Sequence, residues 1–292
     1  MAGSSILKNL IHHGYGNKDL GGEILCPRRK ELDLLDEEKV KEWFKSKKPT
    51  VVILAAAKVG GIQANSRFGA DFIMQNLKIQ INVIEAAWKN NVKRLLFLGS
   101  SCIYPRDALQ PIKEEYLLSN KLEATNEAYA IAKIAGLKLC ENLNTQYDFD
   151  AITLMPTNLY GPGDNFNLEN SHVLPALLRK FHEAKLYSKN EEICWGSGMP
   201  RREFMYIDDF GKACVYVLEN FHPQINNNEI PFLNIGTGLD LPIKELAEKI
   251  ADLFQFKGNI VWDIKEPDGT FQKKLDVEKL NQLGWKSQVS ID

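Results

Sequence analysis

Short apolar runs alternate along this chain with longer amphipathic stretches, and this alternation restricts the fold more than any other feature of the sequence. In chain order, the paired runs and stretches are residues 51–55 with 71–90, 94–99 with 126–145, and 151–155 with 173–185. Such alternation is typical of βαβ units, in which helices cover both faces of a parallel sheet. We therefore predict an α/β fold whose first half is a Rossmann-like, doubly wound sheet. Ligands should bind beyond the carboxyl ends of its strands.

The second half of the chain consists of shorter elements. Beyond residue 165 come a turn at Gly196-Ser197-Gly198, a helix entered through Asp208-Asp209, and an apolar run at 232–235. This change predicts a smaller, mixed α/β lobe. We expect a first domain at 1–164 and a second lobe at 165–292, with some chain crossing between them and the active site in the cleft that they share.

The composition bears on partners and location. The 292 residues are 44% hydrophobic and 25% charged, and the formal net charge of -2 gives no preference for nucleic acid or an anionic membrane, so we expect neither as a partner. The longest apolar run, 51–57, is far shorter than the ~20 residues of a membrane helix, and no secretory pattern follows Met1, which predicts a cytoplasmic protein. The cysteines form no CxxC pair and predict neither a disulfide framework nor a bound metal: Cys26, Cys102, Cys140, Cys194 and Cys214.

A tyrosine and a lysine four residues apart give the clearest chemical signal. In Tyr129-Ala-Ile-Ala-Lys133 the two side chains lie one helical turn apart, where an ammonium favours the phenolate of a tyrosine whose ordinary pKa is ~10. Ser100 follows the predicted strand at 94–98 and can hydrogen-bond a substrate carbonyl beside the tyrosine. Together they predict a proton-transfer site for carbonyl reduction. For the YxxxK spacing alone, the alternative is a solvated pair on a surface helix.

Longer motifs surround these residues and recur along the chain. They are Leu98-Gly-Ser-Ser-Cys-Ile-Tyr-Pro105, Tyr129-Ala-Ile-Ala-Lys-Ile-Ala-Gly136, Met155-Pro-Thr-Asn-Leu-Tyr-Gly161, Ala55-Ala-Ala-Lys-Val-Gly-Gly61, Asn170-Ser-His-Val173, Trp195-Gly-Ser-Gly198 and Arg202-Glu-Phe204. They resemble the GDP-L-fucose synthase family of the extended short-chain dehydrogenases over nearly the whole chain. The resemblance implies NADPH-dependent conversion of GDP-4-dehydro-6-deoxy-D-mannose to GDP-L-fucose, with epimerisation at C3 and C5 before reduction at C4. It also implies a homodimer.

The resemblance assigns the catalytic side chains. It implies Ser100, Tyr129 and Lys133 as the reductase triad, and Cys102 and His172 as the acid/base pair for epimerisation. Inversion next to a ketone requires one group to remove a proton from one face and another to return a proton to the opposite face. A thiol of ordinary pKa ~8.5 and an imidazole of ~6.5 are both close enough to neutrality to do this. A buried structural cysteine and a helix-capping histidine are the alternatives.

The same resemblance implies residues that bind the GDP-sugar. Trp195 and Arg202 match family positions in contact with it, an aromatic face suited to the base and a guanidinium suited to the diphosphate. Lys180 matches a basic substrate contact, and Asp268, within Glu266-Pro-Asp-Gly269, matches another substrate-side position. For each residue taken alone, a surface charge or a core aromatic is the alternative.

The cofactor half matches the family less completely. Family chains open with a strand and a GxxGxxG turn that brings the backbone close to the dinucleotide pyrophosphate. Gly3 matches the last of these glycines, while the strand and the first two glycines have no counterpart in this sequence, which also stops before the family's closing helix. Arg29, after a short predicted strand at 24–26, stands where a basic group meets the 2′-phosphate of NADP, although a solvated turn explains Arg28-Arg29-Lys30 equally well.

The other NADP(H) contacts implied by the resemblance lie after the predicted strands. They are Leu98, Gly99, Ser101, Lys133, Pro156, Thr157, Asn158, Leu159 and His172. On this basis residues 1–164 are the expected NADP-binding domain and residues 165–292 the expected GDP-sugar-binding lobe.

Two other functions stay open. A nucleotide-sugar 4-epimerase or dehydratase shares the triad, but such enzymes lack Cys102 together with His172, and dehydratases usually carry an acidic pair where this chain has Ser101-Cys102. A shortened, non-catalytic homologue that binds GDP-sugars is the alternative from a different class. It follows from the incomplete match to the family's cofactor-binding turn.

Overall fold

The structure is a computed structural model that describes residues 1–168, 171–223, 230–266 and 268–292. Its α-helices are α1 (Ala2–His12), α2 (Glu37–Lys47), α3 (Ile62–Arg67), α4 (Gly69–Lys89), α5 (Glu127–Tyr147), α6 (Val173–Leu186), α7 (Ile207–Asn220), α8 (Ile243–Leu253) and α9 (Glu278–Gln282). Its strands are β1 (Val51–Leu54), β2 (Arg94–Leu98), β3 (Ala151–Pro156), β4 (Asn158–Tyr160), β5 (Glu191–Trp195), β6 (Arg201–Tyr206), β7 (Phe232–Ile235), β8 (Asp240–Pro242), β9 (Asn259–Asp263) and β10 (Gln272–Lys273). Short 3-10 helices are η1 (Lys18–Leu20), η2 (Ser101–Ile103), η3 (Glu114–Tyr116) and η4 (Ala124–Asn126).

Four parallel strands form the sheet of the larger lobe, in the order β1-β2-β3-β7. Every residue of β2 is buried. Leu95 and Phe97 pack into an apolar cluster on one face, and Leu96 and Leu98 pack into a second cluster on the other, because successive side chains of a strand point to opposite faces. A strand buried on both faces requires a continuous apolar run, and residues 95–98 of β2 are such a run, preceded by Arg94, whose guanidinium pairs with Asp150.

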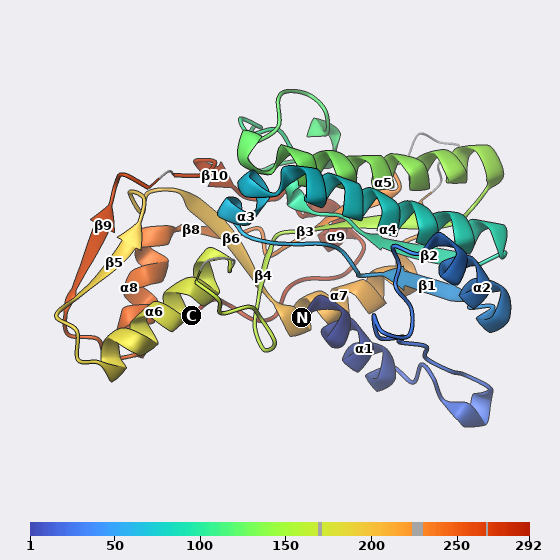
Figure 1. The fold of residues 1–292 in the computed structure, drawn as a ribbon, viewed down its shortest axis with the longest axis horizontal. Coiled ribbons are helices and arrows are strands. Elements are labelled where there is room, and N and C mark those ends of the chain that lie inside the picture. Colours follow the sequence, from blue (N-terminus) through green and yellow to red (C-terminus); the bar gives the residue numbers. More distant parts are fainter. Residues whose placement is uncertain (169–170, 224–229, 267) are drawn as a thin grey trace.

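Helices cover both faces of this sheet (Figure 1). On one face lie α2, α4 and α5, where Phe44 and Ile84 join the cluster around Leu95. On the other lie α1 and α7, where Ile6 and Phe210 pack with the second cluster. The expected doubly wound α/β fold is confirmed. Because parallel strands end at the same edge of a sheet, the loops that follow β1, β2, β3 and β7 meet there.

The strand expected at 24–26 does not form. Residues 22–28 run as irregular chain between η1 and a turn at 29–31, and within the described residues β1 is an edge strand whose hydrogen-bonded neighbour is β2. A strand exists only where another strand satisfies its backbone hydrogen bonds. No described strand lies beyond β1 to pair with residues 24–26, so this segment stays outside the sheet.

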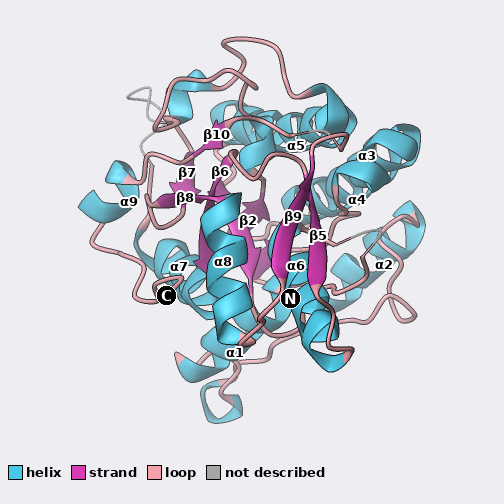
Figure 2. Cartoon of the chain, turned by 90° about the vertical axis from the view of Figure 1, so that its left-hand side faces the viewer, coloured by secondary structure: helices cyan, strands magenta, loops and turns pink. Residues whose placement is uncertain are grey.

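A smaller lobe lies at the other end of the molecule (Figures 1 and 2). There β5 and β9 pair in parallel, and α6 and α8 bury Phe181 and Leu246 in a cluster that also holds Phe204 of β6. The strand β6 pairs in parallel with β4 and β10 and antiparallel with β8. The chain crosses between the lobes, because α7 and β7 follow β6 in sequence and pack in the larger lobe.

A buried carboxylate joins β6 to two neighbouring loops. Glu203 accepts hydrogen bonds from the backbone N–H of Thr237 at 2.6 Å and Gly238 at 2.9 Å, after β7, and of Leu275 at 2.7 Å, after β10. Burial raises the pKa of Glu203, and these hydrogen bonds oppose that rise. Glu203 thus holds the loops after β7 and β10 against β6.

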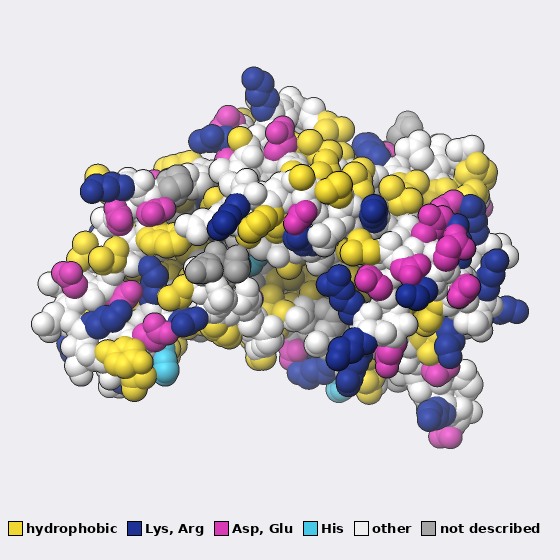
Figure 3. All heavy atoms as spheres, viewed as in Figure 1, with side chains coloured by type: hydrophobic (Ala, Val, Ile, Leu, Met, Phe, Trp, Pro, Cys, Tyr) yellow, Lys and Arg dark blue, Asp and Glu magenta, His cyan; other side chains and the backbone are white. Residues whose placement is uncertain are grey.

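An apolar surface lies on the outer side of α4 and α5. Exposed apolar side chains gather over these two helices (Figure 3), and they include Met74 and Ile81 of α4 and Ile131 and Tyr147 of α5, each 42% to 52% exposed. We refer to these four residues as the α4–α5 surface.

Across the ranges that the structure describes, no helix is both long enough and apolar enough to span a bilayer.

Candidate active site

The loop after β2 begins with Ser100. The Ser100 Oγ accepts a hydrogen bond from the backbone N–H of Cys102 at 3.2 Å and so caps the short helix η2. The chain lies so close to β3 here that a Cβ at Gly99 would collide with the Sδ of Met155. Ser100 and Cys102 therefore follow the carboxyl end of β2 directly, at the edge of the sheet where ligands bind in this class of fold.

Helix α5 brings Tyr129 and Lys133 to the same edge. Tyr129 forms a side-chain hydrogen bond with Ser100 and packs edge-on against Phe72, with ring centroids 6.4 Å apart. Lys133 is only 3% exposed. Its Nζ donates to the backbone carbonyl of Leu98 at 2.7 Å and lies 5.9 Å from the centroid of the Tyr129 ring. The serine, tyrosine and lysine predicted from the sequence thus form one cluster.

The direction of the Tyr129 pKa differs from the expectation. Burial raises the pKa of Tyr129 above its ordinary value, the negative charge of Cys102 adds to the rise, and the hydrogen bond with Ser100 opposes it. Burial also lowers the pKa of Lys133 to about 8. The expected shift toward the phenolate was wrong because desolvation of the phenol dominates. A protonated phenol at neutral pH suits a proton donor.

Cys102 lies among donors from both lobes. Its Sγ accepts from Asn126 Nδ2 at 3.4 Å and from Lys273 Nζ at 3.6 Å. The thiol is partly exposed, and its charge affects the pKa of both Tyr129 and Arg202, which places it close to these two side chains. Cys102 is therefore part of the cluster rather than a buried core cysteine such as Cys140.

His172 is the residue that precedes α6 and serves as its N-cap position, without a side-chain capping hydrogen bond. Asn170, in the same motif, lies outside the described residues. Although His172 as a whole is solvent-exposed, desolvation of its ring lowers its pKa, the negative charge of Asp164 raises it, and the positive charge of Lys273 lowers it. Because Lys273 influences His172 and contacts Cys102, the two predicted acid/base groups both lie near one lysine.

Arg202 and Asp268 border the cluster on the side of the smaller lobe. Burial lowers the pKa of Arg202, whereas the negative charges of Cys102, Asp268 and Glu123 raise it. Asp268 accepts hydrogen bonds from the backbone N–H and the hydroxyl of Ser197, at 2.9 and 2.7 Å. Arg202 thus connects the cluster around Cys102 with the turn that follows β5.

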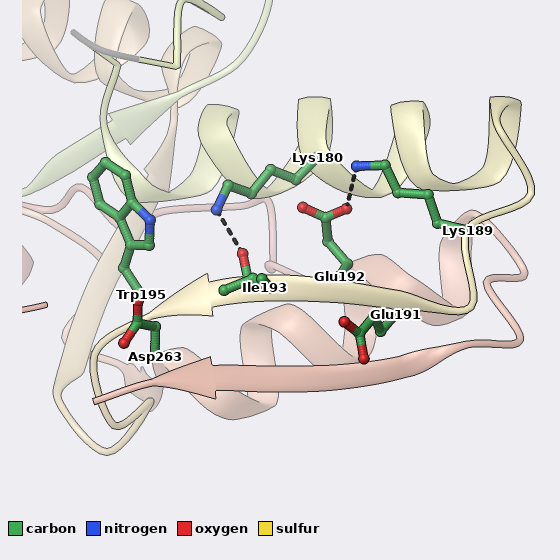
Figure 4. Close-up of a pocket in the computed structure, with 7 residues that line it drawn as sticks. All are labelled: Lys180, Lys189, Glu191, Glu192, Ile193, Trp195 and Asp263. Carbon is green, nitrogen blue, oxygen red and sulfur yellow. Dashed lines mark hydrogen bonds and ion pairs between the residues drawn. The ribbon is translucent and has the colours of Figure 1, made fainter. Parts of the chain in front are cut away.

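A pocket of about 400 Å³ lies along β5, between this strand and α6, and reaches Asp263 at the end of β9. Lys180 and Trp195 line it together with three acidic side chains, Glu191, Glu192 and Asp263 (Figure 4). The Lys180 Nζ donates to the carbonyl of Ile193 at 2.6 Å and lies 5.3 Å from the centroid of the Trp195 ring. Trp195 is 49% exposed, so the pocket presents a half-exposed aromatic ring beside a cation.

The residues expected at NADP(H) are only partly brought together. Gly3 lies in the first turn of α1, where an added Cβ would be 3.8 Å from the Cβ of Ala55, just after β1. Thr157 and Asn158 form side-chain hydrogen bonds to the carbonyl of Glu203, at 3.2 and 2.8 Å. The remaining candidates after β2 and β3 line the same sheet edge: Leu98, Gly99, Ser101, Pro156 and Leu159.

Arg29 lies apart from that edge. Its side chain is 77% exposed in the turn before α2, and its guanidinium is 4.0 Å from the carboxylate of Asp33, four residues later. The geometry is that of the solvated turn that the sequence left open. Its physical reason is the irregular path of residues 22–28, because no strand directs the arginine toward the sheet edge.

Sequence reasoning missed Lys273 and Asn126, the two donors to Cys102. Lys273 stands in Gln272-Lys-Lys-Leu275, where no spacing or neighbour distinguishes it from a solvated lysine. Asn126 lies three residues before Tyr129, close to one helical turn, and that spacing is the signal that could have found it.

Comparisons with known proteins agree with this geometry. Residues 1–236 match the NAD dependent epimerase/dehydratase family. The chain is 51% identical to the GDP-L-fucose synthase of Escherichia coli (strain K12) over 295 residues, covering 100% of this chain and 90% of that protein. It is also similar to two solved structures from Campylobacter jejuni. One is a GDP-6-OMe-4-keto-L-xylo-heptose reductase, with a TM-score of 0.92, 36% identity and coverage of 99% of this chain and 91% of that one.

The other is MlghC, a GDP-mannoheptose C4 reductase with NADP bound, with a TM-score of 0.88, 38% identity and coverage of 99% and 91%. These relatives share the whole fold described above, and the family match spans most of the chain. The chain belongs to the NAD dependent epimerase/dehydratase family and, within it, to the group of the GDP-L-fucose synthases.

Proposed function

We propose that this protein converts GDP-4-dehydro-6-deoxy-D-mannose to GDP-L-fucose, by epimerisation at C3 and C5 followed by reduction of the C4 ketone. The observation that carries the proposal is the single cluster in which Ser100, Tyr129 and Lys133 lie against Cys102. A reductase triad alone fits many members of the family. A thiol beside the triad, with His172 near the lysine that contacts the thiol, supplies the acid/base pair that epimerisation needs.

NADP(H) is the proposed cofactor, and residues 1–164 are the proposed domain for it. The NADP-bound relative supports this choice. The first turn of α1 fits the pyrophosphate, because this helix begins beside Ala55 without a side-chain cap and its N–H groups are free to bind an anion. When bound, the cofactor supplies hydride to the ketone carbon. Lys133, Thr157 and Asn158 lie where they can orient its nicotinamide half.

In the reduction, this chain's side chains handle the ketone oxygen. The Ser100 hydroxyl donates a hydrogen bond to the oxygen, and the Tyr129 phenol gives its proton to the oxygen as negative charge develops there. The raised pKa of Tyr129 keeps that proton in place at neutral pH. Lys133 is held by the Leu98 carbonyl near the tyrosine, where its charge stabilises the phenolate left after transfer.

In the epimerisation, one of Cys102 and His172 removes the proton next to the ketone and the other returns a proton to the opposite face. The lowered pKa of His172 makes its neutral imidazole available as an acceptor. The nearby Asp164 stabilises the imidazolium that results. The ketone oxygen stays within reach of Ser100 and Tyr129, so the enolate formed at each step is stabilised by the same two groups.

The proposed substrate site is in the smaller lobe, which residues 165–292 form apart from the segments, such as α7 and β7, that cross into the larger lobe. The pocket in Figure 4 offers an aromatic ring and a cation. The Trp195 ring suits the guanine base, and Lys180 suits the negative charge next to that base. Arg202, between this pocket and Cys102, suits the diphosphate, and Asp268 fixes the intervening turn through Ser197. A GDP-sugar bound in this way extends its sugar toward the triad.

Solvent exchange separates the two half-reactions. We expect Cys102→Ser to retain reduction of a ketone already in the product configuration but to lose exchange of the C3 and C5 protons with deuterated solvent, because a hydroxyl is too weak an acid to replace the thiol. Proton NMR of the substrate measures the exchange, and Cys26→Ser, at an exposed cysteine, is the matched control. Exchange at the parental rate in Cys102→Ser would show that Cys102 only packs.

We also propose a cytoplasmic homodimer, in which the α4–α5 surface of one chain packs against that of another. Exposed apolar area of this kind usually marks an interface. We expect sedimentation to give twice the 33.1 kDa chain mass, and Ile81→Glu to give the single chain. Leu253→Glu, at a leucine 71% exposed on the other lobe, is the control. A dimer that survives Ile81→Glu unchanged places the interface elsewhere.

A further inference from the structure

Lys273 reaches the catalytic thiol from the opposite lobe. It ends β10, which pairs in parallel with β6 so that Lys273 lies beside Arg202. Two hydrogen bonds fix the chain just after it, from the Lys274 N–H to Gln110 Oε1 at 2.9 Å and from the Leu275 N–H to Glu203 at 2.7 Å. With its backbone anchored in this way, the Lys273 Nζ lies 3.6 Å from the Cys102 Sγ.

We propose that Lys273 is a positioning residue that stabilises the thiolate form of Cys102 during epimerisation. The inference rests on the proposed role of Cys102 and adds a residue to it. An ammonium in contact with a sulfur favours its deprotonated form, and the thiolate is the form through which Cys102 must pass whether it first gives or first takes a proton.

The proton balance shows where this charge matters. When His172 takes the proton next to the ketone, the electron pair of the broken C–H bond enters the enolate. Cys102 then gives its S–H proton to the opposite face of that carbon, and the S–H electron pair stays on sulfur. The products of this exchange are an imidazolium, a thiolate and the inverted carbon. Lys273 offsets the charge left on sulfur, and no oxidant or reductant is involved.

Other groups near the cluster differ from Lys273 in their charge or in their contact with the sulfur. Tyr129 of α5 has no cationic form, and the lowered pKa of His172, before α6, favours its neutral imidazole at neutral pH. Arg202 of β6 is a second cation whose charge interacts with Cys102, but the hydrogen bond described for its Nη1 goes to the carbonyl of Arg201, at 2.8 Å, and not to the sulfur. Asn126 donates to the sulfur as a neutral amide. Within the described residues, Lys273 is the cation with a direct hydrogen bond to Cys102.

Thiol alkylation tests the proposal without turnover. We expect Lys273→Met to lower the rate at which iodoacetamide modifies Cys102 at pH 7 by about tenfold, because only the thiolate reacts. Mass spectrometry of the peptide that contains Cys102 gives this rate, and the exposed Cys26 provides an internal standard in the same sample. Lys273→Arg should restore most of the rate. Lys274→Met removes the same charge one residue later, from a lysine whose charge acts on Asp240, and should leave the rate unchanged.

The same variants are also assayed for exchange of the C3 and C5 protons and for reduction of the C4 ketone. Lys273→Met should slow exchange of the C3 and C5 protons and shift its pH profile to higher pH, while reduction of a ketone in the product configuration stays near the parental rate. Parental alkylation of Cys102 in Lys273→Met, or an equal loss in Lys274→Met, would overturn the inference. These outcomes differ from failure of the proposed function, which appears as undiminished exchange in Cys102→Ser whatever the alkylation rates.

Discussion

Replacing Tyr129 with phenylalanine is expected to lower the rate of C4 reduction by roughly 10²- to 10⁴-fold, the usual contribution of a positioned general acid. The ring of Tyr129 packs against Phe72, and phenylalanine preserves that contact, so the fold and the binding of GDP-sugar should be unaffected. Only the proton donor is removed. The oxidation of NADPH, followed by absorbance with a saturating ketone substrate, measures the effect.

A second tyrosine on the same helix provides the control for this variant. Tyr147 is half exposed and packs against Trp88, with ring centroids 4.6 Å apart, far along α5 from the cluster. Tyr147→Phe should reduce the ketone at the parental rate. If Tyr129→Phe does the same, another group donates the proton and the triad has been assigned wrongly.

The affinity for NADPH should depend on whether a strand pairs with the edge of β1 that has no partner strand among the described residues. We expect a polypeptide of these 292 residues to bind NADPH at least ~100-fold more weakly than one extended by a strand and a complete GxxGxxG turn, a difference of ~2.7 kcal/mol. An added strand can pair with β1, and the turn after it brings further backbone N–H groups beside Gly3 and Ala55. An unpaired edge also favours aggregation.

Calorimetry on both polypeptides measures this difference directly. The affinity for GDP should be the same in the two, because Lys180 and Trp195 lie in the other lobe, and this equality controls for misfolding. Equal NADPH affinity would mean that the first turn of α1 does not hold the pyrophosphate or that another segment completes the site. Equal affinity would also remove the observation that favours a non-catalytic homologue.

The parts that the sequence predicted well are those governed by local patterns. The apolar run at residues 95–98 predicted a strand buried on both faces, and the YxxxK spacing placed Tyr129 and Lys133 on one side of α5. Ser100 followed from its position at the end of β2. These features need only the neighbouring few residues to be understood.

The parts that it missed depend on partners distant in the chain. Whether residues 24–26 form a strand depends on what lies beyond β1, and the direction of the Tyr129 pKa depends on how deeply the assembled fold desolvates the phenol. Lys273 meets Cys102 across 171 positions of sequence. Neither the composition of one segment nor the spacing of its apolar residues shows which distant residues will contact it in the fold.

Helix α5 presents different faces to different partners, and this restricts which of its positions can vary. Tyr129 and Lys133 face the catalytic cluster, whereas Ile131, between them in sequence, is 42% exposed on the α4–α5 surface. If that surface joins two chains, the side chains of a single turn of this helix serve catalysis on one face and contact between the two chains on the other. Drift in its sequence should then be confined to outward positions beyond both, and inhibitors wedged between the chains would disturb the catalytic side chains without entering the active site.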